Sequence, residues 1–329
     1  MQTQLNNPKR SKRILFFQVA LLMLLALALR IPTLYMGLWL DECITIFVCS
    51  QPTLEEMVSH LIVQDFNPPL SHLITRAFIS IFGTGEVIVR IPALIFGILL
   101  VPAMYWLGRV SVSARVGLWC AFFVALSPIA NFFACQARPY SLGLLTGALM
   151  TTFFCRLVKG MGSRWVNIIG YAFTSTAFCY TNTLGVLLPG AFFLAGILIV
   201  YLDSKESDEA ESVKSSLRPL DPFLTVAAPF FTILPWVPNV LMQAKQPLGC
   251  DPGGLTRAPL IFAYNLVMMI PIPIWMGLLL VFGGAVVLFI GLIKLSIKHM
   301  TGSKKELSFD FVRKIPRHLL ALIVAVVVP

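Results

Sequence analysis

The chain has 329 residues, of which 57% are hydrophobic and 12% are charged, and its mean hydropathy is +0.84. This composition excludes a water-soluble globular domain and predicts a polytopic integral membrane protein. The formal net charge of +10 would suit a nucleic-acid partner, but the basic residues alternate with apolar runs. We therefore predict no nucleic-acid binding and assign the basic residues to membrane topology and contact with anionic lipid.

Apolar runs along the chain predict an all-α fold with about nine transmembrane helices, the last of them incomplete. A spanning helix needs ~20 residues, and most of the runs are long enough. The last run has only about 11 residues before Pro329. Because half a span cannot satisfy its backbone in lipid, we expect a truncation there. The runs lie at about 14–29, 87–108, 116–133, 141–158, 165–180, 184–202, 222–241, 270–293 and from 319 onward.

The first run follows a basic stretch at 9–13 and has two possible interpretations. Ala26-Leu27-Ala28 resembles a signal-peptidase site, so the run could be a cleaved signal peptide. Arg30-Ile31-Pro32 would be a poor start for a mature chain, however, and the later spans do not require cleavage. We therefore favour a retained signal-anchor with the N-terminus in the cytosol.

The apolar run at 69–82 is too short to cross a membrane and contains His72 and Arg76, so we predict a helix on the exoplasmic face. His60 and His72 lack metal-site spacing and are read as surface or packing residues. This choice places four loops in the cytosol, and three of the four are clearly basic, as the positive-inside rule requires. The cytosolic loops are 109–115, 159–164, the linker at 203–221, and 294–318; the exoplasmic segments are 31–86, 134–140, 181–183 and 242–264.

The exoplasmic segment 31–86 is expected to contain juxtamembrane helices. Thr53 and Glu56 have the spacing of a capping box, which predicts a helix from Glu55 to about Val63. A preceding helix is predicted over 41–49. Short helices with acidic residues at their starts would form a platform for a site at the lipid–water boundary.

Two adjacent carboxylates, Asp41 and Glu42, follow the first span directly. Of the 15 acidic residues, six lie between Asp41 and Glu86, and none lies between Glu86 and Asp203. Acid–base chemistry by a carboxylate would therefore draw on few candidates, although Asp41 could simply cap the 41–49 helix. The chain has no P-loop or dinucleotide fingerprint, no nucleophile elbow and no His-Glu-x-x-His motif.

A series of short motifs resembles the GT-C membrane glycosyltransferases, in particular relatives of protein O-mannosyltransferases and of bacterial lipid A sugar transferases. Each motif alone is weak, but their order and spacing over about 13–200 are fairly specific. The stretch at 65–70, for example, resembles the family's Asp-x-His-Pro-Pro-Leu. The motifs are Trp39-Leu40-Asp41-Glu42, 65–70, 86–92, Tyr105-Trp106-Leu107-Gly108-Arg109, Ser127-Pro128, 136–142 and Tyr180-Thr181-Asn182-Thr183.

The resemblance implies a single GT-C-type transmembrane domain over 1–329 that transfers a sugar from a polyprenyl-phosphate carrier, with inversion, to an acceptor at the outer membrane face. Asp41 would be the general base, with Glu42 and Asp65 as further acidic groups of the catalytic site. Donor and phosphate binding would fall to Arg138, Arg90 and Tyr140, because a guanidinium meets phosphate oxygens bidentately. The sugar lipid is a substrate; we predict no cofactor and no essential metal, although Asp41 and Asp65 together could hold one.

Two asparagines depart from the family pattern, Asn67 and Asn182, each standing where the family usually has histidine. They keep hydrogen bonding but lose a titratable group. Alternatives therefore remain: a non-enzymatic polyprenyl-lipid translocator, an envelope-assembly scaffold, or an inactive truncated copy. The expected partners are the lipid carrier and a glycan, lipid or protein acceptor, and the expected location is a bacterial plasma membrane.

Overall fold

The computed structural model describes residues 8–65, 67–205, 215–244 and 317–318, all of which belong to one compact unit of the chain. The described residues form helices and no strand. The helices are α1 (Pro8–Arg30), η1 (Ile31–Tyr35), α2 (Leu40–Cys49), α3 (Leu54–Gln64), α4 (Leu70–Phe82), α5 (Glu86–Ser111), α6 (Ala114–Leu126), α7 (Pro128–Ala134), α8 (Tyr140–Val158), α9 (Arg164–Cys179), η2 (Thr183–Val186), α10 (Leu187–Lys205), α11 (Asp221–Ile233), η4 (Leu234–Trp236) and α12 (Val237–Ala244).

Five helical segments are long and apolar enough to cross a membrane, and a sixth is gained if the bent pair α6–α7 counts as one span. The pair bends by 62° at Ser127-Pro128, where proline cannot continue the hydrogen-bond ladder. The predicted run at 165–180 is a helix too, α9, but its 16 residues are fewer than a span usually needs. The expected runs at 270–293 and beyond 319 lie outside the described residues, so the predicted total of nine is not established.

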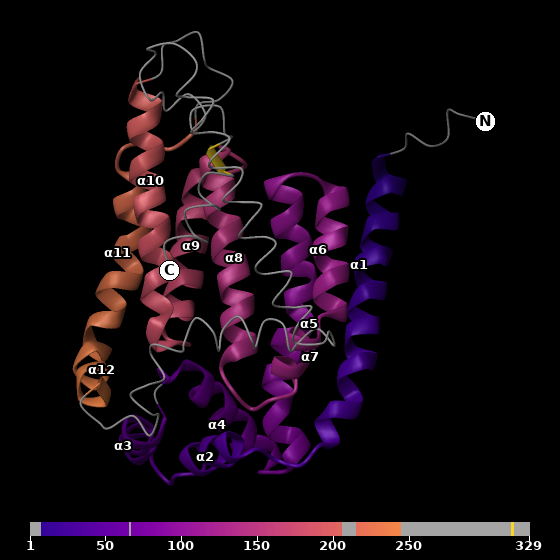
Figure 1. Cartoon of the computed structure of the whole chain (residues 1–329), viewed down its shortest axis with the longest axis vertical. Helices are drawn as coiled ribbons and strands as arrows, with labels where there is room; N and C mark the ends of the chain where they lie inside the picture. The colour runs from indigo at the N-terminus through magenta and orange to yellow at the C-terminus, as the bar shows by residue number, and fades with distance from the viewer. Residues whose placement is uncertain (1–7, 66, 206–214, 245–316, 319–329) are drawn as a thin grey trace, which may run out of the picture. The chain divides into compact units, whose positions relative to one another are not determined.

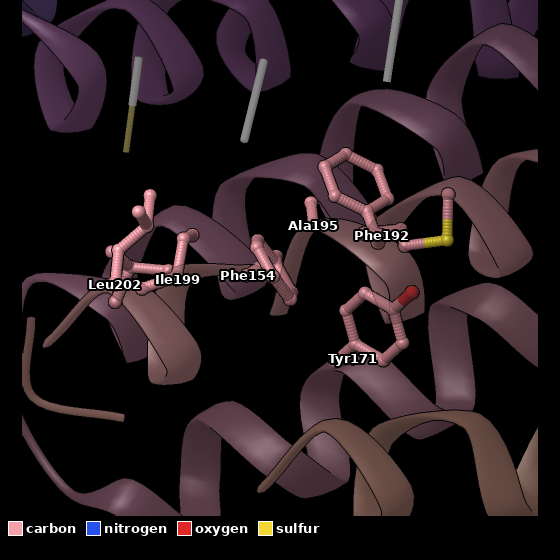
Figure 2. Packing of buried hydrophobic residues seen from close by; sticks show 8 residues of the cluster. Phe154, Tyr171, Phe192, Ala195, Ile199 and Leu202 are labelled. Carbon is pink, nitrogen blue, oxygen red and sulfur yellow. The ribbon is translucent and has the colours of Figure 1, made fainter. Parts of the chain in front are cut away.

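The long helices pack through aromatic side chains at one interface and glycines at another. Between α8, α9 and α10, the Phe154 ring centroid lies 4.8 Å from that of Phe192 and 5.8 Å from that of Tyr171 (Figure 2). Between α5 and α6, an added Cβ on Gly117 would lie only 2.4 Å from the Tyr105 carbonyl oxygen. This position needs glycine because the two backbones approach too closely for a side chain.

The short helices α2, α3 and α4 gather at the end of the long helices opposite the start of α1 (Figure 1). The sequence located all three correctly to within a residue or two, and the Thr53 hydroxyl accepts the Glu56 N–H at 3.2 Å as the cap predicts. Val48, Met57 and Leu61 pack with Trp236, which joins these helices to the rest of the bundle. α4 ends at Gly83, whose φ of 88° begins the turn into α5.

The loop predicted as a solvated linker at 203–221 differs from that expectation at both ends. Asp221 is fully buried at the start of α11, where it pairs with Arg164 and accepts the backbone N–H of Arg218 at 2.9 Å. Asp203 accepts Nε of Arg317 at 2.9 Å and the N–H of Ser215 at 3.0 Å. The two acids therefore anchor the ends of the loop.

Candidate active site

The predicted site residues come from four separate parts of the chain and lie at one end of the bundle. Asp41 and Glu42 occupy the first turn of α2, and Asp65 ends α3. Arg90 lies in the first turns of α5, and Arg138 precedes α8. Hydrogen bonds join these segments into two buried ion pairs, and α2, α3 and α4 mark that end in Figure 1.

Glu42 and Arg90 form the first of these pairs. Nε of Arg90 lies 2.8 Å from Oε1 of Glu42, and Nη2 lies 2.6 Å from Oε2. The same carboxylate accepts the backbone N–H groups of Ala137 at 2.8 Å and Trp39 at 3.1 Å. Burial alone would raise the pKa of Glu42, but these hydrogen bonds outweigh it and hold the pKa below its usual range.

The rest of the Arg90 guanidinium is bound to backbone. It donates to the carbonyl oxygens of Leu34 at 2.8 Å and Gly37 at 3.1 Å, and also to that of Met36. Every nitrogen of the group therefore has a protein acceptor. The pair joins α2, α5, the 34–37 segment and Ala137, which is the geometry of a brace that positions the neighbouring residues.

Asp65 and Arg138 form the second pair, which also includes a histidine. Nη1 of Arg138 donates to Oδ2 of Asp65 and to the Thr45 hydroxyl at 3.3 Å. Nε2 of the buried His72 lies 3.3 Å from the same Oδ2. Burial alone would raise the pKa of Asp65, but His72, Arg138 and Asn67 hold it well below its usual range. Asp65 is thus an anion enclosed by donors.

Asn67 stands where the family usually has histidine, and it makes hydrogen bonds, as predicted. Its backbone N–H donates to Oδ1 of Asp65 at 3.0 Å, and its side-chain amide donates to the same atom at 2.7 Å. The other asparagine, Asn182, lines an apolar groove.

Asp41 differs from Glu42 and Asp65 because its side chain is exposed. It lines a pocket of about 130 Å³ at the start of α2, with Trp39, Leu40, Glu42, Gln136 and Arg138 in the same wall. Burial would lower the pKa of Arg138, but Asp65, Tyr140 and Asp41 raise it above its usual range, so its guanidinium is a permanent cation in this pocket. The pocket thus brings an accessible carboxylate and a fixed positive charge together.

Tyr140, two residues after Arg138, lines a second, larger cavity. Its ring packs on Phe133 with centroids 4.6 Å apart, and both residues line a groove of about 520 Å³ between α5, α6, α7, α8 and the 178–188 segment. The groove walls are mostly apolar, with Leu100, Met104, Val124, Leu144 and Leu188 among them. Since Arg138 lies only two residues before Tyr140, the groove begins beside the polar pocket.

His72, Thr45, Gln136 and Trp39 were not predicted as site residues. Of the two roles expected for His72, surface or packing, the surface role is wrong: the residue is buried, with Nε2 3.3 Å from Oδ2 of Asp65. Thr45 could have been found, because it follows Asp41 by four residues and so shares its helix face. Gln136 and Trp39 lie in the motifs 136–142 and Trp39-Leu40-Asp41-Glu42, and these motifs were the signal that could have found them. Among the described residues, no three His, Cys, Asp or Glu side chains lie close enough together to hold a metal ion.

The comparisons with known proteins give a match at the level of a family. The family model described as dolichyl-phosphate-mannose-protein mannosyltransferase matches residues 67–236, just over half of the chain. Arg90, Arg138 and Tyr140 fall inside the matched range, and Asp41, Glu42 and Asp65 precede it. A search among curated proteins finds no match. The chain therefore belongs to the dolichyl-phosphate-mannose-protein mannosyltransferase family, a family of membrane glycosyltransferases of the GT-C type that use a polyprenyl-phosphate-linked sugar.

Proposed function

We propose that this protein transfers one sugar from a polyprenyl-phosphate carrier to an acceptor hydroxyl at the outer face of the membrane. The observation that carries the proposal is the pocket at the start of α2, where Asp41 and Arg138 lie in one wall. Such a transfer needs a base for the acceptor proton and a cation for the departing phosphate. Asp41 supplies the first and Arg138 the second.

Asp41 is the general base in this proposal because it is the acid in the pocket that lacks a structural partner of its own. Its side chain makes no hydrogen bond within the described part of the chain, whereas Glu42 and Asp65 are each bound by several donors. A base must be able to accept a proton from a substrate within hydrogen-bond reach. The carboxylates of Glu42 and Asp65 are buried and already hydrogen-bonded, so they serve better as positioning groups.

Arg138 is the phosphate-binding residue in this proposal. Nη1 is held by Asp65 and Thr45, which fixes the orientation of the guanidinium plane. Arg138 also lines the pocket that contains Asp41. The guanidinium is therefore oriented and lies in the pocket wall where the carrier phosphate would bind. Arg90 was expected to bind the phosphate of the sugar donor, but we assign it a positioning role. Its guanidinium nitrogens already donate hydrogen bonds to Glu42 and to three backbone carbonyls.

The apolar groove lined by Tyr140 is the proposed binding site of the prenyl chain. Its volume of about 520 Å³ falls within the usual range of ligand sites, roughly 300–1,000 Å³. A carrier whose phosphate lies at Arg138 would continue past Tyr140 into this groove. The hydrocarbon chain would then meet Leu100, Val124 and Leu144 rather than water.

In the proposed reaction, the acceptor oxygen attacks the anomeric carbon while the bond from that carbon to the phosphate oxygen breaks. The acceptor proton moves to a carboxylate oxygen of Asp41, and the bonding electrons leave with the carrier phosphate toward Arg138. A single displacement inverts the anomeric carbon. No step in this scheme requires a metal ion.

Charge supports an outward-facing site. The start of α2, which lines the pocket, lies at the end of the bundle opposite the start of α1, whose first turns contain the basic residues of 9–13 (Figure 1). Arg109 and Arg115 flank the loop between α5 and α6, and Lys159 and Arg164 border the loop between α8 and α9. Both loops lie at the end of the bundle where α1 starts (Figure 1). By the positive-inside rule, these loops are cytosolic and the pocket faces outward, which in a bacterial plasma membrane is the periplasmic side.

The proposal is tested by sugar transfer in membranes that contain the full chain and are supplied with labelled polyprenyl-phosphate hexose. Wild type would be compared with Asp41→Asn at equal abundance, and with Glu55→Gln, an exposed acid in the first turn of α3, as the matched control. We expect Asp41→Asn to lose ~100-fold or more and Glu55→Gln to lose nothing. Equal transfer by wild type and Asp41→Asn would exclude Asp41 as the base. No transfer by wild type would contradict the proposed function and favour a translocator, a scaffold or an inactive copy.

A further inference from the structure

Trp39 presents an exposed indole ring in the wall of the pocket that contains Asp41 and Arg138. Trp39 is 59% exposed, although its side chain is large and hydrophobic. One contact with a neighbouring ring is made edge-on to Phe132 of α7, with centroids 6.2 Å apart and planes at 84°. This packing supports the ring from one side and leaves much of its surface accessible.

The backbone of Trp39 is fixed by the same network that buries Glu42. Its N–H donates to Oε2 of Glu42 at 3.1 Å, and its carbonyl accepts the N–H groups of Glu42 and Cys43 at 3.0 Å each. Because Arg90 in turn holds Glu42, the start of α2 is braced against α5. The ring is therefore attached to a rigid support, which is what a binding surface needs.

An exposed tryptophan in a membrane protein has a simpler explanation, since such rings are common at the lipid–water interface. The surroundings of Trp39 argue for more than this role. A ring that only anchors the protein in lipid has no need of a carboxylate, an amide and a guanidinium beside it. Here Asp41, Gln136 and Arg138 share its pocket. An aromatic wall with a few converging polar groups is typical of a small-molecule site.

We infer that the indole face of Trp39 binds the ring of the sugar that is transferred. This inference rests on the proposed function. The C–H groups on one face of a sugar ring carry slight positive charge and form an apolar surface, which suits the negative face of an indole. The sugar hydroxyls at the ring edge would meet the Gln136 amide and the Asp41 carboxylate.

The order of groups in the pocket supports the transferred sugar as the occupant. In a direct displacement, the sugar lies between its phosphate and the attacking oxygen, hence between Arg138 and Asp41, and Trp39 lines the pocket that contains both.

The experiment measures binding of two probes to the purified full chain: polyprenyl phosphate that carries one hexose, and the same polyprenyl phosphate without the sugar. Wild type is compared with Trp39→Ala, Trp39→Phe and Trp119→Ala. Trp119 of α6 is the matched control, since it is 60% exposed and lies outside the pocket. Trp39→Leu, which keeps apolar bulk, replaces the alanine variant if that one does not fold.

We expect Trp39→Ala to weaken binding of the hexose lipid about tenfold and to leave binding of the sugar-free lipid within about twofold. Trp39→Phe should recover most of the loss, and Trp119→Ala should change neither probe. If Trp39→Ala weakens binding of both lipids equally, Trp39 is a membrane anchor and the inference is wrong. The inference is also wrong if Trp39→Ala weakens binding of neither lipid. If wild type binds neither probe, the proposed function itself is wrong. If wild type binds the hexose lipid but Trp39→Ala does not weaken that binding selectively, only the inference about Trp39 is wrong.

Discussion

The buried pair of Glu42 and Arg90 allows a quantitative prediction. In Glu42→Gln, the side chain keeps its shape but loses the charge that compensates a guanidinium only 1% exposed. Removing one partner of a buried ion pair typically costs about 3–5 kcal/mol, because the remaining charge stays uncompensated. At roughly 2–4 °C per kcal/mol, the apparent melting temperature should fall by on the order of 10 °C.

The assay is thermal unfolding of the full chain in detergent, followed by the amount that remains monodisperse after heating. Glu55→Gln is the control, and as an exposed surface change it should stay within about 0.5 kcal/mol of wild type. The double variant Glu42→Met/Arg90→Met should be more stable than the sum of the two single changes predicts, because it removes both charges. Recovery should be incomplete, since Arg90 also holds the carbonyls of the 34–37 segment.

A different result would refute this reasoning. If Glu42→Gln unfolds at the wild-type temperature but loses sugar transfer, Glu42 is a catalytic group rather than a brace. If the stability loss of Glu42→Met/Arg90→Met equals the sum of the losses of the single variants Glu42→Met and Arg90→Met, the two residues are not energetically coupled. The ion pair then does not stabilise the fold.

Three further predictions follow from other parts of the fold. Gly117→Ala should lower the melting temperature, because the added Cβ would meet the Tyr105 carbonyl oxygen. The control Gly190→Ala has open space around it in α10 and should be neutral or stabilising by about 1 kcal/mol in the same thermal assay. Arg30→Leu should not destabilise the protein, because the three guanidinium nitrogens of this buried residue have no hydrogen-bond partner within the described segments; a clear loss of stability would contradict this. Stability should fall as pH drops below about 4, because the pKa of Asp65 is lower in the folded than in the unfolded state. The resulting stabilisation is present above the unfolded-state pKa of ~3.9 and is lost as pH falls toward the folded-state pKa. A flat stability profile from pH 6 to pH 3 would contradict this prediction.

Much of the fold could be predicted from local pattern. Long apolar runs located α1, α5, α8 and α10, because a lipid environment permits few alternatives to a helix. Thr53 located the start of α3 because a cap acts on the next turn of the same chain. In both cases the controlling physics operates within about 20 residues.

The pairing of the charges could not be predicted in the same way. Glu42 and Arg90 are 48 residues apart, and Asp65 and Arg138 are 73 residues apart. Sequence alone identified all four as candidates, yet it gave no means to decide which acid is enclosed by donors and which is accessible. The burial of His72 and the anchoring of Asp203 and Asp221 depend on the same kind of long-range contact.

The most direct test of the account measures the rate of sugar transfer and the melting temperature on the same two variants, Asp41→Asn and Asp65→Asn. We predict that Asp41→Asn loses ~100-fold or more in rate at an unchanged melting temperature, because its side chain is exposed and makes no structural hydrogen bond within the described residues. Asp65→Asn should lower the melting temperature, because Arg138 and His72 lose their anion. If Asp41→Asn keeps the wild-type rate while Asp65→Asn loses rate at full stability, Asp65 is the base and the central claim is wrong.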